Sequence, residues 1–83
     1  MVTLKEFIEE EVNDHIRDVI LRSIEQGKLD NKDKDELVFN RYSLEMHFPE
    51  DTVTIYDDVF SEDKPLSLRI EVFLKAIKTY RTN

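Results

Sequence analysis

The first segment of the chain has the hydrophobic period of a helix. Apolar side chains recur at three- and four-residue spacing over the first 24 residues, and the set comprises Leu4, Phe7, Ile8, Val12, Ile16, Val19, Ile20 and Ile24. This spacing gathers them on one helical face. Thr3 and Glu6 match a capping box, and Gly27 supplies the left-handed residue that commonly closes a helix. The pattern predicts one helix over residues 3–26.

The middle of the chain changes to the period of a strand. Residues 28–36 alternate in charge around a single apolar side chain, which predicts a solvated loop. From residue 37 onward, one side of the expected strand holds Val38, Tyr42, Leu44, Met46 and Phe48, and the other holds Arg41, Ser43, Glu45 and His47. Residues 49–51 have turn chemistry, and residues 52–56 are a β-branched and aromatic run. We therefore expect a β-hairpin.

The last segment carries two overlapping patterns. Val59 and Phe60 are expected to cover an apolar surface, and Pro65 stands where a helix commonly begins. After it, Leu66, Ile70, Phe73, Leu74 and Ile77 form a helical stripe, whereas Leu66, Leu68, Ile70 and Val72 alternate as a strand does. Length and the lysines near the end favour a helix over residues 66–81. A third strand at residues 66–70 stays open as the alternative.

These elements define the expected fold class. Their order is α-β-β-α, with both helices packed on one face of a short antiparallel sheet. The 83 residues carry no internal repeat and no linker composition. We therefore expect a single α+β domain over residues 1–83.

Composition removes several kinds of chemistry. The chain has no cysteine, one glycine and two prolines, so disulfides, thiolate zinc sites and glycine-rich phosphate loops are excluded. An EF-hand loop that started at Asp33 would need glycine and glutamate where Val38 and Leu44 stand. His15 and His47 lie in segments that nothing in the sequence brings together. We expect no metal, no cofactor, no catalytic residue and no enzymatic activity.

The charge and the apolar runs bear on partners and location. A net charge of -7 makes binding to nucleic-acid phosphates unfavourable. No apolar run approaches the roughly 20 residues that span a bilayer, and the start of the chain is acidic where a signal peptide is apolar. The expected location is the cytoplasm, with no membrane and no direct nucleic-acid partner.

The charges are unevenly placed along the chain. Residues 1–63 hold eighteen acids and seven bases, whereas residues 64–83 hold one acid and five bases. Such acidity serves solubility or complements a basic partner surface. Tyr42 and Tyr56 have the composition of interface anchors, although strand aromatics are also ordinary core residues. The candidate partner-binding residues are Asp30, Asp33, Asp35, Glu36, Tyr42, Tyr56, Asp57 and Asp58.

A small, acidic chain with this order of elements is similar to bacterial toxin-immunity proteins. The nearest thing to a motif is the run Phe48–Asp58 followed by Phe73–Ile77, and the resemblance otherwise covers size, acidity and helix-hairpin-helix order. It implies a stoichiometric inhibitor that neutralises a basic, nuclease-type toxin with carboxylates placed where phosphates would bind. No individual residue is carried over by motif.

Other functions stay open from the sequence. A phage-type inhibitor that mimics nucleic acid uses the same electrostatics on a different target. A small regulatory or adaptor subunit instead binds through an apolar patch. The sequence leaves the oligomeric state open, and a homodimer is one alternative, since a thin core is often completed by dimerisation.

Overall fold

The structure is a computed structural model that describes residues 1–79. Over these residues the chain forms three helices and a four-stranded antiparallel sheet, so the α+β class is confirmed while the order of elements differs from the α-β-β-α expectation. The elements are α1 (Leu4–Glu11), α2 (Asp14–Leu29), β1 (Lys34–Val38), β2 (Tyr42–His47), β3 (Thr52–Asp57), β4 (Leu66–Arg69) and α3 (Ile70–Thr79).

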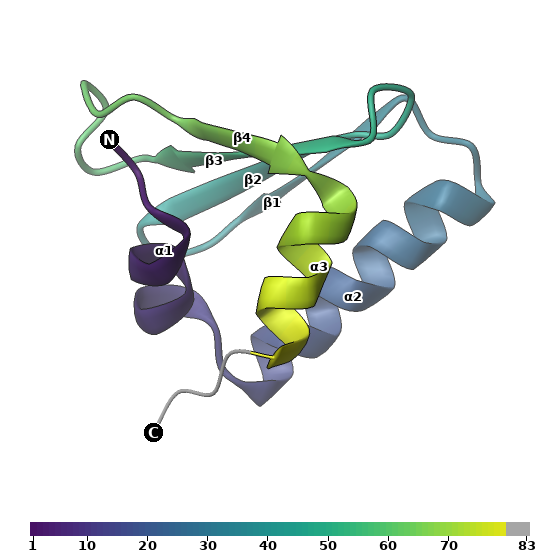
Figure 1. The fold of residues 1–83 in the computed structure, drawn as a ribbon, viewed down its shortest axis with the longest axis horizontal. Coiled ribbons are helices and arrows are strands. Elements are labelled where there is room, and N and C mark those ends of the chain that lie inside the picture. The colour runs from purple at the N-terminus through teal and green to yellow at the C-terminus, as the bar shows by residue number, and fades with distance from the viewer. Residues whose placement is uncertain (80–83) are drawn as a thin grey trace.

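The prediction of a single N-terminal helix over residues 3–26 is wrong, because this segment forms two helices, α1 and α2. Asn13 has extended backbone angles, and its side-chain oxygen accepts a hydrogen bond of 2.8 Å from the amide of Ile16. Asparagine at such a position caps a new helix rather than continuing the old one. The break turns α1 away from α2, so that the two helices cover different parts of the sheet (Figure 1). The cap at Thr3 is as expected, with its hydroxyl 3.2 Å from the amide of Glu6.

Gly27 does not close the helix. The helix continues to Leu29, and the left-handed backbone angle falls at Asn31, with φ of 52°. Gly27 is instead buried under the ring of Phe48. A Cβ at this position would lie 2.1 Å from Phe48 Cζ, so the absence of a side chain is what allows the ring to pack against α2.

The charged segment after α2 is only partly the loop that its composition predicts. Lys34–Val38 pairs with β2 along its whole length and forms the outer strand β1. Its helix-side positions are half-buried and the alternate ones are exposed. An edge strand needs few apolar residues because half of it faces water, which is why charge alternation concealed it. Val38, expected on the buried side, is 67% exposed.

The predicted hairpin is confirmed from residue 42 onward, in β2 and β3, but its first strand was expected to start at Leu37, and residues 37 and 38 instead end β1, with residues 39–41 forming the turn into β2. Its register pairs Ser43 with Tyr56 and His47 with Thr52. Asp51 adopts the left-handed conformation, with φ of 58°, at the end of the turn. The sheet order follows the chain, β1-β2-β3-β4, so each strand is antiparallel to the one before it.

Both patterns in the last segment are realised, one after the other. Leu66–Arg69 is the strand β4, and the helix begins at Ile70, four residues later than expected. Pro65 therefore precedes a strand and not a helix. The amide of Ile70 donates to the carbonyl of Asp51 at 2.9 Å, which fixes the switch from strand to helix beside the hairpin turn. The expected end of this helix at residue 81 lies outside the described residues.

All three helices lie on one face of the sheet, as the sequence predicts for its two (Figure 1). Side chains from the helices and from this face form one apolar core, and its fully buried aromatic members are Phe7, Tyr42 and Phe73. No described helix covers the opposite face, which we call the open face (Figure 1). Within residues 1–79, none of the helices has the length and hydropathy needed to cross a membrane.

Candidate functional site

The structure separates the candidate carboxylates into two groups at opposite ends of the sheet. The start of β1 lies beside the β2–β3 turn, because Lys34 pairs with His47 and His47 pairs with Thr52. We call this the turn end. The end of β3 lies beside the β1–β2 turn, which contains Arg41, and we call this the Arg41 end. Asp30, Asp33, Asp35 and Glu36 belong to the turn end or to β1 next to it, whereas Tyr56, Asp57 and Asp58 belong to the Arg41 end.

The carboxylates near the turn end are spread over α2, its loop and β1. Asp30 caps α2 and accepts two hydrogen bonds of 3.0 Å from the side chain of Gln26. Asp35 lies 3.6 Å from the ammonium of Lys32. Asp33 and Glu36 are exposed. No aromatic side chain lies among these four acids, and the exposed apolar residues beside them are Leu29, before Asp30, and Val38, at the end of β1.

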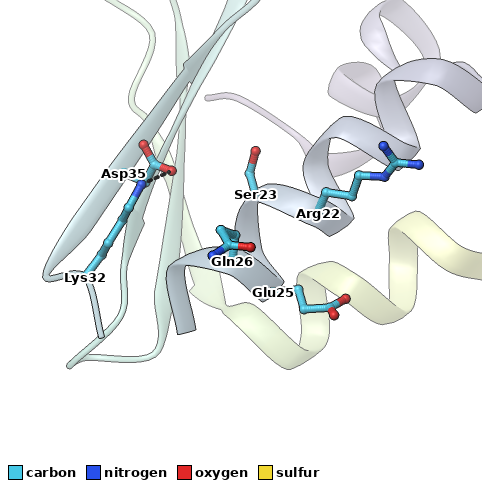
Figure 2. Close-up of a pocket in the computed structure, with 6 residues that line it drawn as sticks. All are labelled: Arg22, Ser23, Glu25, Gln26, Lys32 and Asp35. Carbon is cyan, nitrogen blue, oxygen red and sulfur yellow. Dashed lines mark ion pairs between the residues drawn. The ribbon is translucent and has the colours of Figure 1, made fainter. Parts of the chain in front are cut away.

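An open hollow of about 430 Å³ lies between α2 and β1. Figure 2 shows Asp35 and Lys32 on one side of it, facing α2 across the gap. The residues around it are Arg22, Ser23, Glu25, Gln26, Lys32 and Asp35. Because both signs of charge line an open and polar space, it does not favour one small-molecule ligand.

The Arg41 end is organised around one guanidinium. Arg41 donates from Nε and Nη2 to Asp57 Oδ2, at 3.2 and 2.9 Å, and its Nη1 lies 3.3 Å from Glu10 Oε1. Its backbone amide donates to Glu11 Oε1 at 2.9 Å. These contacts tie the end of α1 to the β1–β2 turn and to the end of β3. Arg41 thereby joins three segments that are far apart in sequence.

The side chain of Asp57 holds the loop after β3 in place through hydrogen bonds to its backbone amides. Its Oδ1 accepts hydrogen bonds from the amides of Val59 and Phe60, at 3.0 and 2.9 Å, while Oδ2 accepts from Arg41. The Arg41 hydrogen bonds lower the pKa of Asp57 against the opposing effect of burial, and the Asp57 carboxylate raises the pKa of Arg41. The side chain of Asp57 is 1% exposed, so it acts inside the fold and does not face a partner.

Phe60 and Val59 do not cover an apolar surface, contrary to the expectation from their hydrophobicity. They are 51% and 60% exposed. The ring of Phe60 stacks on the Arg41 guanidinium, whose Cζ lies 5.0 Å from the ring centroid. Asp63 donates its amide to the carbonyl of Phe60 at 3.0 Å. Hydrogen bonds to both the amide and the carbonyl of Phe60 therefore fix its backbone, and its large apolar ring lies at the surface against a charged side chain.

Acidic side chains surround this exposed pair. Asp58 is exposed and accepts a hydrogen bond of 3.1 Å from Ser43 on the open face. Glu10 approaches Arg41 from α1, and Glu62 follows Phe60 in the same loop; the next acid, Asp63, lies 3.7 Å from the N-terminal ammonium of Met1 and is neutralised by it. Arg41 is neutralised by its own carboxylates, so the surface around Phe60 is apolar at its centre and acidic at its margin. We call Asp58, Val59, Phe60 and Glu62 the acidic aromatic patch.

The two candidate tyrosines have different environments. Tyr42 is fully buried, and its ring meets Phe7 edge-on at a centroid distance of 5.6 Å. Burial raises the pKa of its phenol. Within residues 1–79, the Tyr42 hydroxyl has no hydrogen-bond partner. Tyr56 lies on the open face and is 37% exposed. Of the two, only Tyr56 presents its side chain at the surface.

The histidines are not brought together. His15 is exposed on α2, and His47 lies on the open face with its Nε2 2.6 Å from Glu45 Oε1. Among residues 1–79, no three histidine or carboxylate side chains converge in a way that would hold a metal ion.

Sequence reasoning missed Arg41, Glu10 and Phe60 as a unit. They come from three segments, so no spacing rule relates them. The one local signal was Asp57, because an aspartate followed by exposed turn residues commonly accepts hydrogen bonds from the next amides. That signal predicts a tight turn but not the arginine that completes it.

No family model matches the chain, and no curated protein or solved structure shows significant similarity to it.

Proposed function

We propose that this chain is a stoichiometric protein-binding module that docks on a basic protein surface through the acidic aromatic patch. In its most specific form it is an inhibitor of the immunity type, which neutralises a nuclease-like toxin. The observation that carries the proposal is Phe60, half-exposed and stacked on Arg41 within an acidic margin.

The patch has the anatomy of an interface anchor. Interface cores are enriched in aromatic side chains, phenylalanine included, and have a polar rim, and binding is tighter where the anchor is already ordered before contact. Phe60 meets both conditions because Asp57 and Asp63 fix its backbone, at 2.9 and 3.0 Å. Ordering this loop therefore adds little to the entropic cost of association.

The acidic margin specifies the sign of the partner. The chain has a net charge of -7, and eighteen of its nineteen acids lie within residues 1–63. Complementary charge accelerates encounter by about 10- to 1000-fold and loses this effect as salt rises. A nuclease groove is basic because it binds phosphates, so it is the class of surface that suits this patch best.

The test uses the immobilised chain to capture partners from a native extract, followed by kinetics on each captured protein. Phe60→Ala should weaken binding about tenfold or more, because the anchor ring is lost. Val72→Ala is the matched control, since Val72 is 50% exposed in the first turn of α3, which begins beside the β2–β3 turn and far from the Arg41 end. If the captured protein is a nuclease, its activity should fall to zero at one equivalent of the chain.

Charge is tested separately from the anchor. Asp58→Asn with Glu62→Gln should slow association and flatten its dependence on salt, whereas Glu50→Gln with Glu71→Gln should change neither. A partner that is neutral or acidic, and that binds equally well to Phe60→Ala, contradicts the proposal. Capture that depends on Phe60 but not on salt would instead favour an adaptor that binds through apolar contact.

A further inference from the structure

We propose that the outer edge of β1 is a second binding site, which takes up an extended segment of a partner as an added antiparallel strand. The expected segment carries, from its N- to its C-terminus at alternate positions, an apolar, a basic and an acidic side chain. This site lies along the strand itself and does not depend on the acidic aromatic patch.

The backbone of β1 has one free side. The amide of Phe39 donates to the carbonyl of Tyr42, and the amide of Phe48 donates to the carbonyl of Asp33, at 2.9 and 3.0 Å. Every residue of β1 has a register partner in β2, but hydrogen-bonded residues alternate along an antiparallel strand. The odd-numbered residues of this segment are therefore the ones whose N–H and C=O groups bond to β2. The N–H and C=O groups of Lys34, Glu36 and Val38 therefore point away from the sheet. No described strand lies beyond them.

One of these outward amides already has a local substitute for a partner. The amide of Glu36 donates to Asp35 Oδ1 at 2.9 Å. The carboxylate oxygen thus satisfies a donor that a carbonyl of an added strand would satisfy. When a carbonyl of an added strand takes over the Glu36 amide, the Asp35 carboxylate keeps its contact with Lys32, because its other oxygen lies 3.6 Å from the Lys32 ammonium.

The edge has space on both faces of the sheet for alternate side chains. On the helix side lies the hollow between α2 and β1, into which Asp35 and Lys32 face (Figure 2). On the open face a second, smaller hollow is lined by Lys34, Asp35, Glu36 and Glu45. An added strand points successive side chains to opposite faces, so each hollow receives every second residue.

The side chains on the open face specify what lies opposite them. Glu36 pairs across the strands with Glu45, so two carboxylates lie side by side and favour a basic residue next to Glu36. Lys34 favours an acidic residue, and the exposed Val38 favours an apolar one. In antiparallel order these read apolar, basic, acidic along the incoming segment.

The same charges disfavour a second copy of this chain as the occupant. Full antiparallel overlap of β1 with another β1 places Glu36 opposite Glu36. Like charges directly opposite destabilise a strand pair, and charged edge strands in general resist self-association. The occupant is therefore a partner segment of complementary pattern.

The probe is the capped peptide Thr-Val-Thr-Lys-Thr-Glu-Thr, and its matched control exchanges the lysine and the glutamate. The test titrates each peptide into the full chain and follows the backbone amides by NMR. We expect the probe to bind about two- to tenfold more tightly than the control, the range for two exposed charge pairs. The amides of Lys34, Glu36 and Val38 should become protected from hydrogen exchange.

Two further comparisons test the geometry. N-methylation of the valine, lysine and glutamate amides should abolish binding, whereas N-methylation of the threonine amides, which face away, should preserve it. The double variant Lys34→Glu with Glu36→Lys should reverse the preference between the two peptides. Glu50→Lys, which alters an exposed acid in the hairpin turn, should leave the preference unchanged.

Several results would overturn the inference. They are the absence of saturable binding, equal effects of the two N-methylation patterns, protection elsewhere than on β1, and self-association through β1 in place of peptide binding. Phe60→Ala should not affect the peptide. Failure of the acidic aromatic patch and failure of the β1 site are therefore distinguished by different variants.

Discussion

Replacing Gly27 with alanine should destabilise the protein, although alanine is the better helix former. Within a helix this substitution alone gains about 1 kcal/mol. Here the new Cβ would lie 2.1 Å from Phe48 Cζ, 2.6 Å from Cε2 and 2.9 Å from Cε1. Carbon atoms in contact normally lie about 3.5 to 4.0 Å apart, so the ring has to move by more than an ångström.

The size of the effect follows from what the ring loses. Forcing extra volume into a packed site costs about 1 to 3 kcal/mol, and full exposure of a phenylalanine costs a similar amount. Phe48 is only half-buried, which limits the loss. Subtracting the gain of about 1 kcal/mol in helix propensity leaves an expected net destabilisation of about 0 to 2 kcal/mol.

A double-mutant cycle with Phe48→Leu isolates this contact. Leucine retains apolar cover but lacks the ring-tip atoms that collide with the new Cβ. In that background Gly27→Ala should stabilise the protein by about 0.5 to 1 kcal/mol, so the sign of its effect reverses. The assay is urea unfolding of the four proteins, followed by circular dichroism. A stabilising Gly27→Ala in the parent chain, or an equal effect in both backgrounds, would refute the reasoning.

Three other substitutions probe the core and the Arg41 end. Ile20→Ala removes a fully buried side chain and should lower the free energy of unfolding by about 2 to 5 kcal/mol; a change below half a kcal/mol in urea would contradict its core position. Tyr42→Phe removes a buried hydroxyl without a partner and should stabilise the fold by about 1 kcal/mol, as measured by the same unfolding assay, and a clear loss would mean that the hydroxyl is satisfied. Asp57 has a pKa below the ordinary 3.8, so its contribution is complete above that value and disappears as pH falls toward the folded pKa. Asp57→Asn should therefore be less stable at neutral pH and lose less stability between pH 5 and pH 2, and parallel pH profiles would exclude this role.

The sequence alone determined the fold class and the main buried positions. Helical spacing placed Phe7, Ile20 and Ile24 in the core, a period of two identified β2, and a β-branched and aromatic run identified β3. These predictions hold because periodicity reflects local backbone geometry, which each segment carries within itself. The Thr3 cap is local for the same reason.

Local signals also competed, and tertiary packing decided between them. Residues 66–79 contain strand and helix patterns together, and the bond from Ile70 to the carbonyl of Asp51 sets where one becomes the other. Gly27 resembled a helix terminator by composition, whereas its role depends on a ring that is distant in sequence. The strand β1 is defined by its pairing with β2, since an edge strand with few apolar residues carries little periodic signal.

The candidate sites belong almost wholly to the tertiary structure. Acidity was visible in the sequence, but the separation of its carboxylates between the two ends of the sheet follows from strand order and register. The patch at Phe60 exists because Arg41, Glu10 and Asp57 meet from three segments. Composition records how many charges a chain has, whereas only the folded backbone determines which charges neutralise one another and which remain for a partner.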